Sequence, residues 1–187
     1  LPGSLSNGDM LLFGTYSQHN ETFASLPSGW TALFTFDTGG SGDAVLWAKI
    51  VDGTGTESGS ITCFGSNGAD GSFTVALESG ISSFGTLVDF NSQNTASTPT
   101  DQVVNASSLG TLPFLVFGMY AGASTMPIAD AGFSGATADF TVGDATADNV
   151  YFKAKFYAAG SSPADITVSM ADVGKENCLW SGIIPLT

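Results

Sequence analysis

The side chains that carry most enzyme chemistry are scarce in this sequence, and histidine is the scarcest. His19 is the single histidine, and it stands in the polar stretch 17–21. A serine-type triad needs a histidine base, and no Gly-x-Ser-x-Gly elbow accompanies this one. Catalytic zinc usually has several histidine ligands, more than one histidine can supply. We therefore interpret His19 as a loop residue and expect no catalytic residue, no metal ligand and no cofactor-binding residue.

Carboxylates are abundant, with 17 Asp and Glu residues. A glycosidase needs two acids on either side of a cleft, and Glu21, Glu57, Glu78 and Glu176 would supply many pairs. Most acids stand instead in turn contexts, where an Asp side chain bonds to nearby backbone. Examples are Asp37, Asp43, Asp70, Asp144 and Asp148. An enzyme with paired carboxylates is our third hypothesis, and we predict that the chain is not an enzyme.

Two acidic loops are candidate calcium sites, because hard cations bind clustered loop oxygens. Segments 37–43 and 144–148 are the best candidates, yet neither has EF-hand spacing or a Gly-Gly-x-Gly-x-Asp repeat. Solvated turns are the simpler interpretation. We therefore predict no bound metal.

The cysteines and tryptophans leave two questions open. Cys63 and Cys178 lie far apart and fit no metal-ligand spacing, so either two buried thiols, which we favour, or a disulfide would account for them. Trp30, Trp47 and Trp180 raise the hypothesis that exposed rings stack on sugars, although tryptophan is more often a core or edge anchor. The alternative function is thus a carbohydrate-binding β-sandwich module of a secreted or cell-surface protein, with a glycan as ligand.

The charge balance excludes two classes of partner. The 187 residues carry a formal net charge of −13, with four lysines and no arginine. Binding to nucleic acid or to anionic lipid needs clustered cations, so neither is expected as a partner. Only 11% of the residues are charged while 43% are hydrophobic, which is typical of a globular chain. No apolar run approaches the ~20 residues that cross a bilayer, so the chain as given is predicted to be soluble.

The pattern of apolar residues predicts strands almost everywhere. Short aromatic and β-branched segments at 10–16, 44–51, 72–77 and 149–157 are bounded by Gly, Asn, Asp and Ser. No segment keeps apolar residues at helical spacing over three turns without a Gly or Pro, so almost no helix is expected. We predict an all-β, antiparallel, jelly-roll-like β-sandwich, formed as a single domain over residues 1–187.

An internal match indicates pseudo-repeated halves. Residues 11–16 align with 115–120 at an offset of 104, with Leu, Phe, Gly and Tyr identical. Segments 45–47 and 61–62 align with 150–152 and 166–167 near an offset of 105, and Ala48-Lys49 matches Ala154-Lys155 one position out of step. General likeness among apolar strands is the alternative. We predict half-repeats at about 5–80 and 110–187 packed face to face, joined by a polar crossover loop at about 91–101.

Four motifs of the first half occur in the order of a known module. They are Gly8-Asp9-Met10-Leu11-Leu12, Pro27-Ser28-Gly29-Trp30-Thr31, the apolar strand 45–51 and the Ser/Thr-rich segment 59–62. This order resembles a β-sandwich module of structural proteins of tailed bacteriophages, over roughly residues 5–80. Trp47-Ala48-Lys49 departs from the usual Tyr-Tyr-Lys of that module. Segments 149–157 and 165–170 resemble its closing strands or a degenerate copy.

The resemblance implies a non-enzymatic virion structural protein, a capsid decoration (cement) or fibre component on the phage particle surface. Its partners would be the major capsid protein or other virion proteins, and it would form a homo-oligomer. No catalytic residue carries over. Pro27, Gly29 and Trp30 would form a structural turn, with Pro presetting it, Gly relieving it sterically and Trp plugging the sandwich end.

Attachment would use a part of the chain that pairs readily. The apolar N-terminal strand, an edge strand and the 91–101 loop are the candidates, because sheet edges pair with other chains. Segment 179–187 is either a final strand or a docking tail. We favour the strand, because Trp180, Ile183 and Ile184 need burial.

Overall fold

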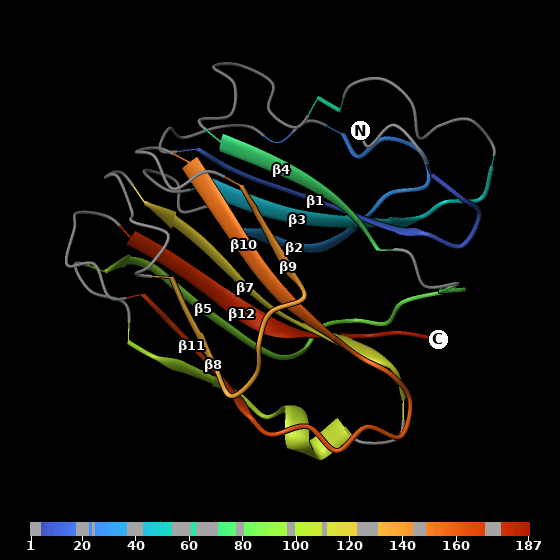
Figure 1. Ribbon diagram of the computed structural model, residues 1–187. Helices are drawn as coiled ribbons and strands as arrows, with labels where there is room; N and C mark the ends of the chain where they lie inside the picture. The colour runs from blue at the N-terminus through green and yellow to red at the C-terminus, as the bar shows by residue number, and fades with distance from the viewer. Residues whose placement is uncertain are drawn as a thin grey trace.

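The computed structural model describes residues 5–17, 23, 25–36, 43–53, 61–62, 71–77, 81–96, 100–109, 112–122, 131–143, 149–170 and 177–187. Three antiparallel sheets lie in three layers (Figure 1). The four-stranded sheet has the order β2 (Thr31–Phe36), β3 (Asp43–Ile50), β1 (Met10–Ser17), β4 (Gly71–Leu77). The five-stranded sheet has the order β5 (Val88–Ala96), β12 (Asn177–Pro185), β7 (Phe114–Gly122), β10 (Asn149–Tyr157), β9 (Phe140–Gly143). The three-stranded sheet has the order β6 (Gln102–Val104), β11 (Ile166–Met170), β8 (Ala131–Ser134), and a 3-10 helix η1 (Ala106–Leu109) follows β6.

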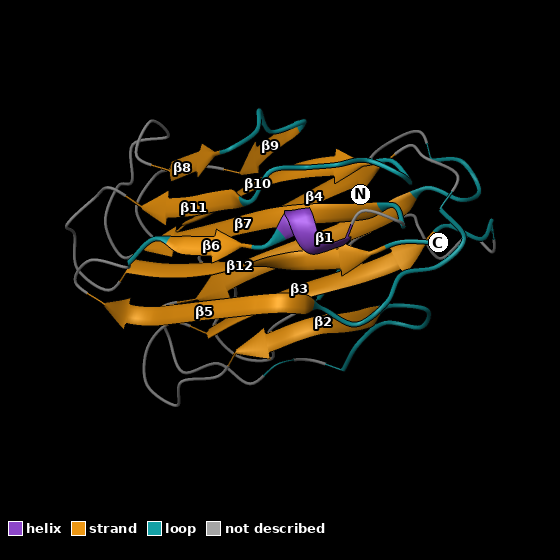
Figure 2. Ribbon diagram, turned by 90° about the horizontal axis from the view of Figure 1, so that it is seen from below, coloured by secondary structure: helices purple, strands orange, loops and turns teal. Residues whose placement is uncertain are grey.

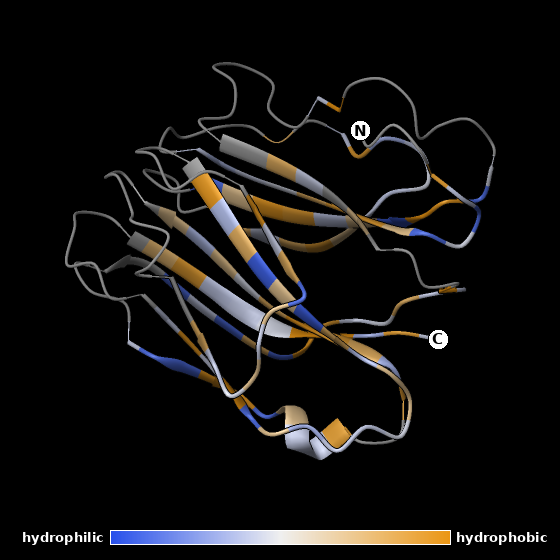
Figure 3. Ribbon diagram, viewed as in Figure 1, coloured by the Kyte–Doolittle hydropathy of each residue, from blue (hydrophilic) through white to orange (hydrophobic). Residues whose placement is uncertain are grey.

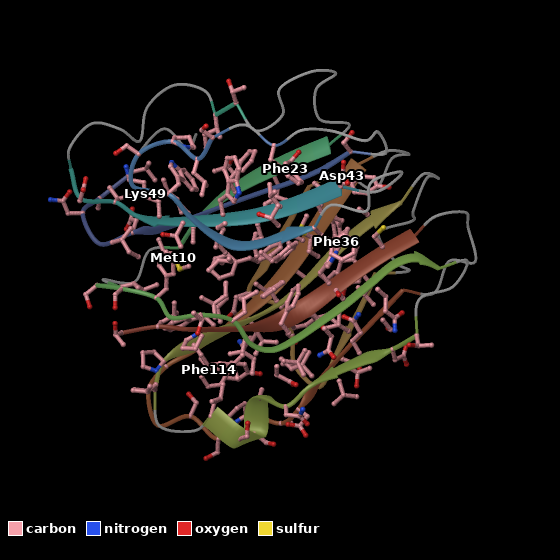
Figure 4. The ribbon with its side chains drawn as sticks, turned by 180° about the vertical axis from the view of Figure 1, so that it is seen from behind. Met10, Phe23, Phe36, Asp43, Lys49 and Phe114 are labelled. Atoms are coloured by element: carbon pink, nitrogen blue, oxygen red, sulfur yellow. The ribbon has the colours of Figure 1, made fainter. Side chains whose placement is uncertain are left out.

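The five-stranded sheet is the middle layer and is buried on both faces. Successive residues of a strand point to opposite faces, so Phe117 and Met119 of β7 pack in a central core with the four-stranded sheet. Phe114 and Val116 pack in a lower core with the three-stranded sheet. Figure 4 shows Met10 between the first two layers and Phe114 on the far side of the middle layer. Burial of both faces explains the continuous apolar run of β7, which alternation alone would not produce.

The outer face of the four-stranded sheet is also covered. Leu11, Phe13, Trp30 and Trp47 form an outer cluster there, and Ile61 packs against it from a segment outside the strands. Residues of β1 are therefore buried on both faces. By contrast with β1, hydrophobic and hydrophilic residues alternate along β10 (Figure 3).

The predicted all-β antiparallel sandwich is confirmed, and the third layer is an addition to it. Among the described residues η1 is the single helical element. The finer jelly-roll arrangement is not confirmed, because the four strands of the first sheet are consecutive in the chain and do not alternate between sheets. Segment 179–187 forms a strand as favoured, since β12 lies between β5 and β7.

The prediction of a crossover loop at 91–101 is wrong for most of that segment. Residues 91–96 belong to β5, an edge strand paired with β12. A polar sequence is compatible with an edge strand, because hydrogen bonds to one neighbour hold the backbone while many side chains remain in water. Residues 97–99 lie outside the described residues, and 102–104 form β6.

Strand order recurs in the two larger sheets. The order β2-β3-β1-β4 corresponds to β9-β10-β7-β12, with antiparallel pairs throughout. The matched residues do not face equivalent sides, because Phe13 lies in the outer cluster and Phe117 in the central core. Ala48 and Ala154, one position out of step, both face the central core. A shift of one residue exchanges the two faces of a strand, so the half-repeats stay a prediction.

One carboxylate fastens η1 to the loop before β11. The backbone N–H of Ser107 donates to Asp165 Oδ1 at 3.0 Å. Hydrogen bonds from the Ser107 hydroxyl and from its N–H hold the pKa of Asp165 below its ordinary value. The contact is therefore present at neutral pH and is lost as the pH falls through the lowered pKa.

We expect the amide signal of Ser107 to titrate with the carboxyl of Asp165 in an NMR experiment at acid pH. Asp165→Asn should abolish that titration, whereas Asp101→Asn, which removes a carboxylate elsewhere, should leave it unchanged. An identical titration of Ser107 in the Asp165→Asn variant would contradict the assignment.

Candidate functional site

The Pro-Ser-Gly-Trp motif forms a tight turn that leads into β2. The N–H of Trp30 donates to the carbonyl of Pro27 at 3.2 Å, and Gly29 has φ of 83°. A positive φ at the third residue is typical of a type II turn and favours glycine. A Cβ on Gly29 would also lie 3.2 Å from Nζ of Lys49, which is 2% exposed. Pro27 is the first residue of this turn, so it does not occupy the second position, where proline would preset φ.

Trp30 packs on the outer face of the four-stranded sheet and does not plug the end of the sandwich. Its ring meets Phe13 edge to face, with 6.4 Å between ring centroids. Trp30, Trp47 and Trp180 are 7%, 1% and 0% exposed. The hypothesis that these three rings form a sugar-stacking platform is therefore wrong, because a platform ring must present its face to solvent.

Directly after the turn, the first residues of β2 form one wall of a pocket of about 170 Å³. The other wall is the segment that precedes β5. The pocket is lined by Thr31, Ala32, Leu33, Phe84, Gly85, Thr86 and Leu87. Its lining contains no carboxylate, amine, imidazole or thiol, and two threonine hydroxyls are its only polar side-chain groups. This composition suits the binding of an apolar group and supplies no acid, base or strong nucleophile.

A β-bulge in β2 shapes the first wall. Ala32 lies opposite Trp47 and Phe34 lies opposite Leu46, so Leu33 is an extra residue in the register. Because a bulge places consecutive residues on one face, Leu33 and Phe34 both pack against the central core. Leu33 thereby becomes part of the pocket wall.

The second wall is fastened to the C-terminal strand. The N–H groups of Ser82 and Ser83 donate to the carbonyl of Thr187 at 2.7 and 3.1 Å. The N–H of Gly85 donates to the carbonyl of Pro185 at 2.9 Å, and Phe84 pairs with Leu186 in an isolated bridge. These backbone hydrogen bonds within the chain fix the position of the wall.

Asp89 is the one described residue other than glycine with a positive φ, 50°. Its carboxylate accepts hydrogen bonds from the backbone N–H and the Nδ2 of Asn105, at 2.6 and 2.9 Å. Val88 and Phe90 on either side are 39% and 38% exposed. A positive φ at a residue other than glycine is a strained backbone conformation. Such conformations persist only where neighbouring residues enforce them, and they are enriched at functional sites.

Pocket and strained strand lie on one side of the molecule. We call residues 31–33 and 84–90 the open edge. Figure 2 shows β2 and β5 along the same side, with β8 and β9 along the opposite one. The ring centroids of Phe34 and Phe90 are 5.1 Å apart, which joins the exposed residues of β5 to the inside of β2.

Two of the three described lysines, Lys153 and Lys155, stand on β10, away from the open edge. Lys49 lies near that edge but is buried beneath the 27–30 turn. Lys155 Nζ is 2.7 Å from Asp139 Oδ1, and burial lowers the pKa of Lys153. Asp89 and the exposed Asp101, by contrast, lie along or beside β5.

Most residues weighed for chemistry fall outside the described residues. These are His19, Glu21, Asp37, Glu57, Cys63, Asp70, Glu78, Asp144, Asp148 and Glu176. Asp43 and Cys178 are buried, at the start of β3 and in the central core. The described part of the chain contains no group of three or more metal-ligating side chains. Nor does it contain a helix long and apolar enough to span a membrane.

Sequence reasoning identified the turn but missed the pocket beside it. Residues 31–33 and 84–87 are far apart in the chain, and no motif links them. The one local signal is the pair Val88 and Phe90, apolar residues at strand spacing immediately before a polar run.

Comparison with known protein families, curated proteins and solved structures finds no match.

Proposed function

We propose that this chain is a non-enzymatic structural protein of a bacteriophage particle, a capsid decoration or fibre component attached by surface contact. The observation that carries the proposal is the open edge. It joins a largely apolar pocket, whose second wall is fixed by backbone hydrogen bonds, to exposed Val88 and Phe90, and the pocket lining holds no acid, base or thiol. Such a surface suits a lasting contact between proteins better than a reaction.

Two further features support the proposal. The Pro27–Trp30 turn, which carries the resemblance to phage structural modules, sets where β2 begins and so positions one pocket wall. The net charge of −13 would also keep the protein from sticking to packaged nucleic acid.

The carbohydrate-binding alternative has lost its motivating observation, since the three tryptophans are buried. We do not pursue it. A particle-surface protein of this kind would act in several copies, with the major capsid protein or another virion protein as partner.

Mass spectrometry of purified particles tests the proposal. We expect peptides of this chain at a fixed ratio to the major capsid protein, retained through density-gradient purification. Purified chain added to particles that lack it should sediment with them. Absence from particles, together with a monomeric state at all concentrations in analytical ultracentrifugation, would overturn the proposal.

A further inference from the structure

We propose that the open edge binds an extended segment of a partner protein, which adds as a strand beside β2. One apolar side chain of that segment would fill the pocket, and basic residues would alternate with its apolar ones. The inference rests on the proposed function, because it specifies how the particle partner is held.

The first support is the free side of β2. Within the described strands β2 pairs with β3 alone and ends the four-stranded sheet. The outer backbone groups of such an edge strand can pair with another chain. Side chains of an added strand would point alternately into and out of the sandwich. Thr31 lies opposite Ala48 of the central core, so its side chain faces inward, and it is exposed beside the pocket where an inward side chain would enter.

The second support is the size and lining of the pocket. At about 170 Å³ it is comparable to cavities of roughly 150 Å³ that hold a benzene molecule. Leu33, Phe84 and Leu87 supply apolar walls. The pocket therefore suits one large side chain such as Phe or Leu, which would act as the anchor of the contact.

The third support is charge. The chain carries −13, Lys153 and Lys155 lie on β10, away from this edge, and Lys49, the one described lysine near it, is 2% exposed beneath the 27–30 turn. Asp89 and Asp101 lie along or beside β5. Like charges across an interface disfavour association, whereas a basic segment would be complementary. A second copy of this acidic chain is for that reason a poorer occupant than a basic segment.

The fourth support is the strained backbone at Asp89, which lies between the exposed residues Val88 and Phe90. Its two hydrogen bonds to Asn105 hold the left-handed conformation between Val88 and Phe90. Both apolar side chains remain partly in solvent beside the pocket, where an added strand would cover them. Coverage of this surface would add to the apolar area buried on binding.

The direct test uses a synthetic peptide, Lys-Val-Lys-Phe-Lys-Val-Lys, titrated into the whole chain and followed by NMR. We expect chemical-shift changes at 31–36 and 84–90 and slower amide exchange in β2. Three altered peptides should each bind at least tenfold more weakly: Glu in place of Lys, Ala in place of Phe, and N-methylation of alternate amides to block strand pairing. Equal binding by the N-methylated peptide, or shifts confined to β9 and β10, would overturn the inference.

Matched variants of the protein distinguish binding of the peptide at the open edge from non-specific attraction of a cationic peptide to an acidic protein. Thr31→Trp, at the inward-facing residue of the first wall, should fill the pocket and weaken binding of the Lys-Val-Lys-Phe-Lys-Val-Lys peptide at least tenfold. Ala164→Trp, at an exposed alanine in the loop before β11, should not. Val88→Lys changes an exposed residue outside the pocket and should also weaken binding, because it repels the cationic peptide. Unchanged affinity in both Thr31→Trp and Val88→Lys would contradict the inference.

Particle incorporation distinguishes the two proposals. Thr31→Trp should be lost from particles while Ala164→Trp is retained. If both variants are incorporated equally, the docking inference fails and the particle function stands. If the native chain is absent from particles but still binds the peptide at the open edge, the particle function fails and the docking inference stands.

Discussion

Trp180→Ala should lower the free energy of unfolding by about 3–5 kcal/mol, the usual range for removing a fully buried tryptophan. Trp180 is 0% exposed and stands on β12, inside the middle layer. Its ring packs against Tyr16 and Phe34, with centroids 6.4 and 6.0 Å away. The cavity would lie where three strands of two sheets meet, a site that cannot collapse. For a chain of this length the melting temperature should fall by roughly 6–20 °C.

Trp180→Phe is the matched control. The indole N–H of Trp180 is buried and has no hydrogen-bond partner, and an unsatisfied donor of this kind is itself costly. Phenylalanine keeps most of the ring and removes the donor, so the loss should stay below about 1.5 kcal/mol. Urea unfolding followed by circular dichroism measures both variants. Equal losses in the two variants would contradict the packing argument.

Gly14→Ala should destabilise the fold by about 1–3 kcal/mol, although alanine normally suits a strand better than glycine. Gly14 lies opposite Phe73 in the register of β1 and β4, and a Cβ there would overlap the Phe73 ring. That ring cannot easily withdraw, because it stacks on Phe152 of the middle layer with 4.7 Å between centroids. The glycine thus makes room for a contact that joins two layers.

Gly182→Ala provides the comparison within the same core. A Cβ at Gly182 would meet its nearest neighbours at 3.4 Å, close to ordinary van der Waals contact. The free energy of unfolding should therefore change by less than about 0.5 kcal/mol, as for a substitution without a specific clash. Thermal unfolding of both variants measures their stability relative to the native chain. A Gly14→Ala protein as stable as Gly182→Ala would show that Phe73 is free to move.

The sequence predicted the fold class because apolar periodicity and turn residues act locally. Segments 10–16, 44–51, 72–77 and 149–157 correspond to β1, β3, β4 and β10. The third layer was missed because β6, β8 and β11 are short and their pairing is set by distant contacts. The loop predicted at 91–101 failed for a related reason, since β12 supplies the hydrogen bonds that make this polar segment a strand.

The candidate site was less predictable than the strands. Gly29 could be placed in a turn from its neighbours, because turn chemistry is local. The pocket depends on a bulge at Leu33 and on a wall held by Thr187 and Pro185, which lie about a hundred positions from it along the chain. Tryptophan is more often buried than exposed, and Trp30, Trp47 and Trp180 are all buried. Which faces of the strands are covered depends on how the three layers pack, and that packing could not be predicted from the sequence.

The position of β12 has a consequence for how the protein is made. This strand comes after all the others in the sequence, yet it lies between β5 and β7. During synthesis β5 and β7 leave the ribosome long before the strand that joins them, so the middle layer cannot close until β12 emerges. Both neighbouring layers pack on that sheet, so they cannot dock completely until β12 has completed it. The protein therefore completes its fold after translation of β12, with β5 exposed to chaperones and to other nascent chains until then.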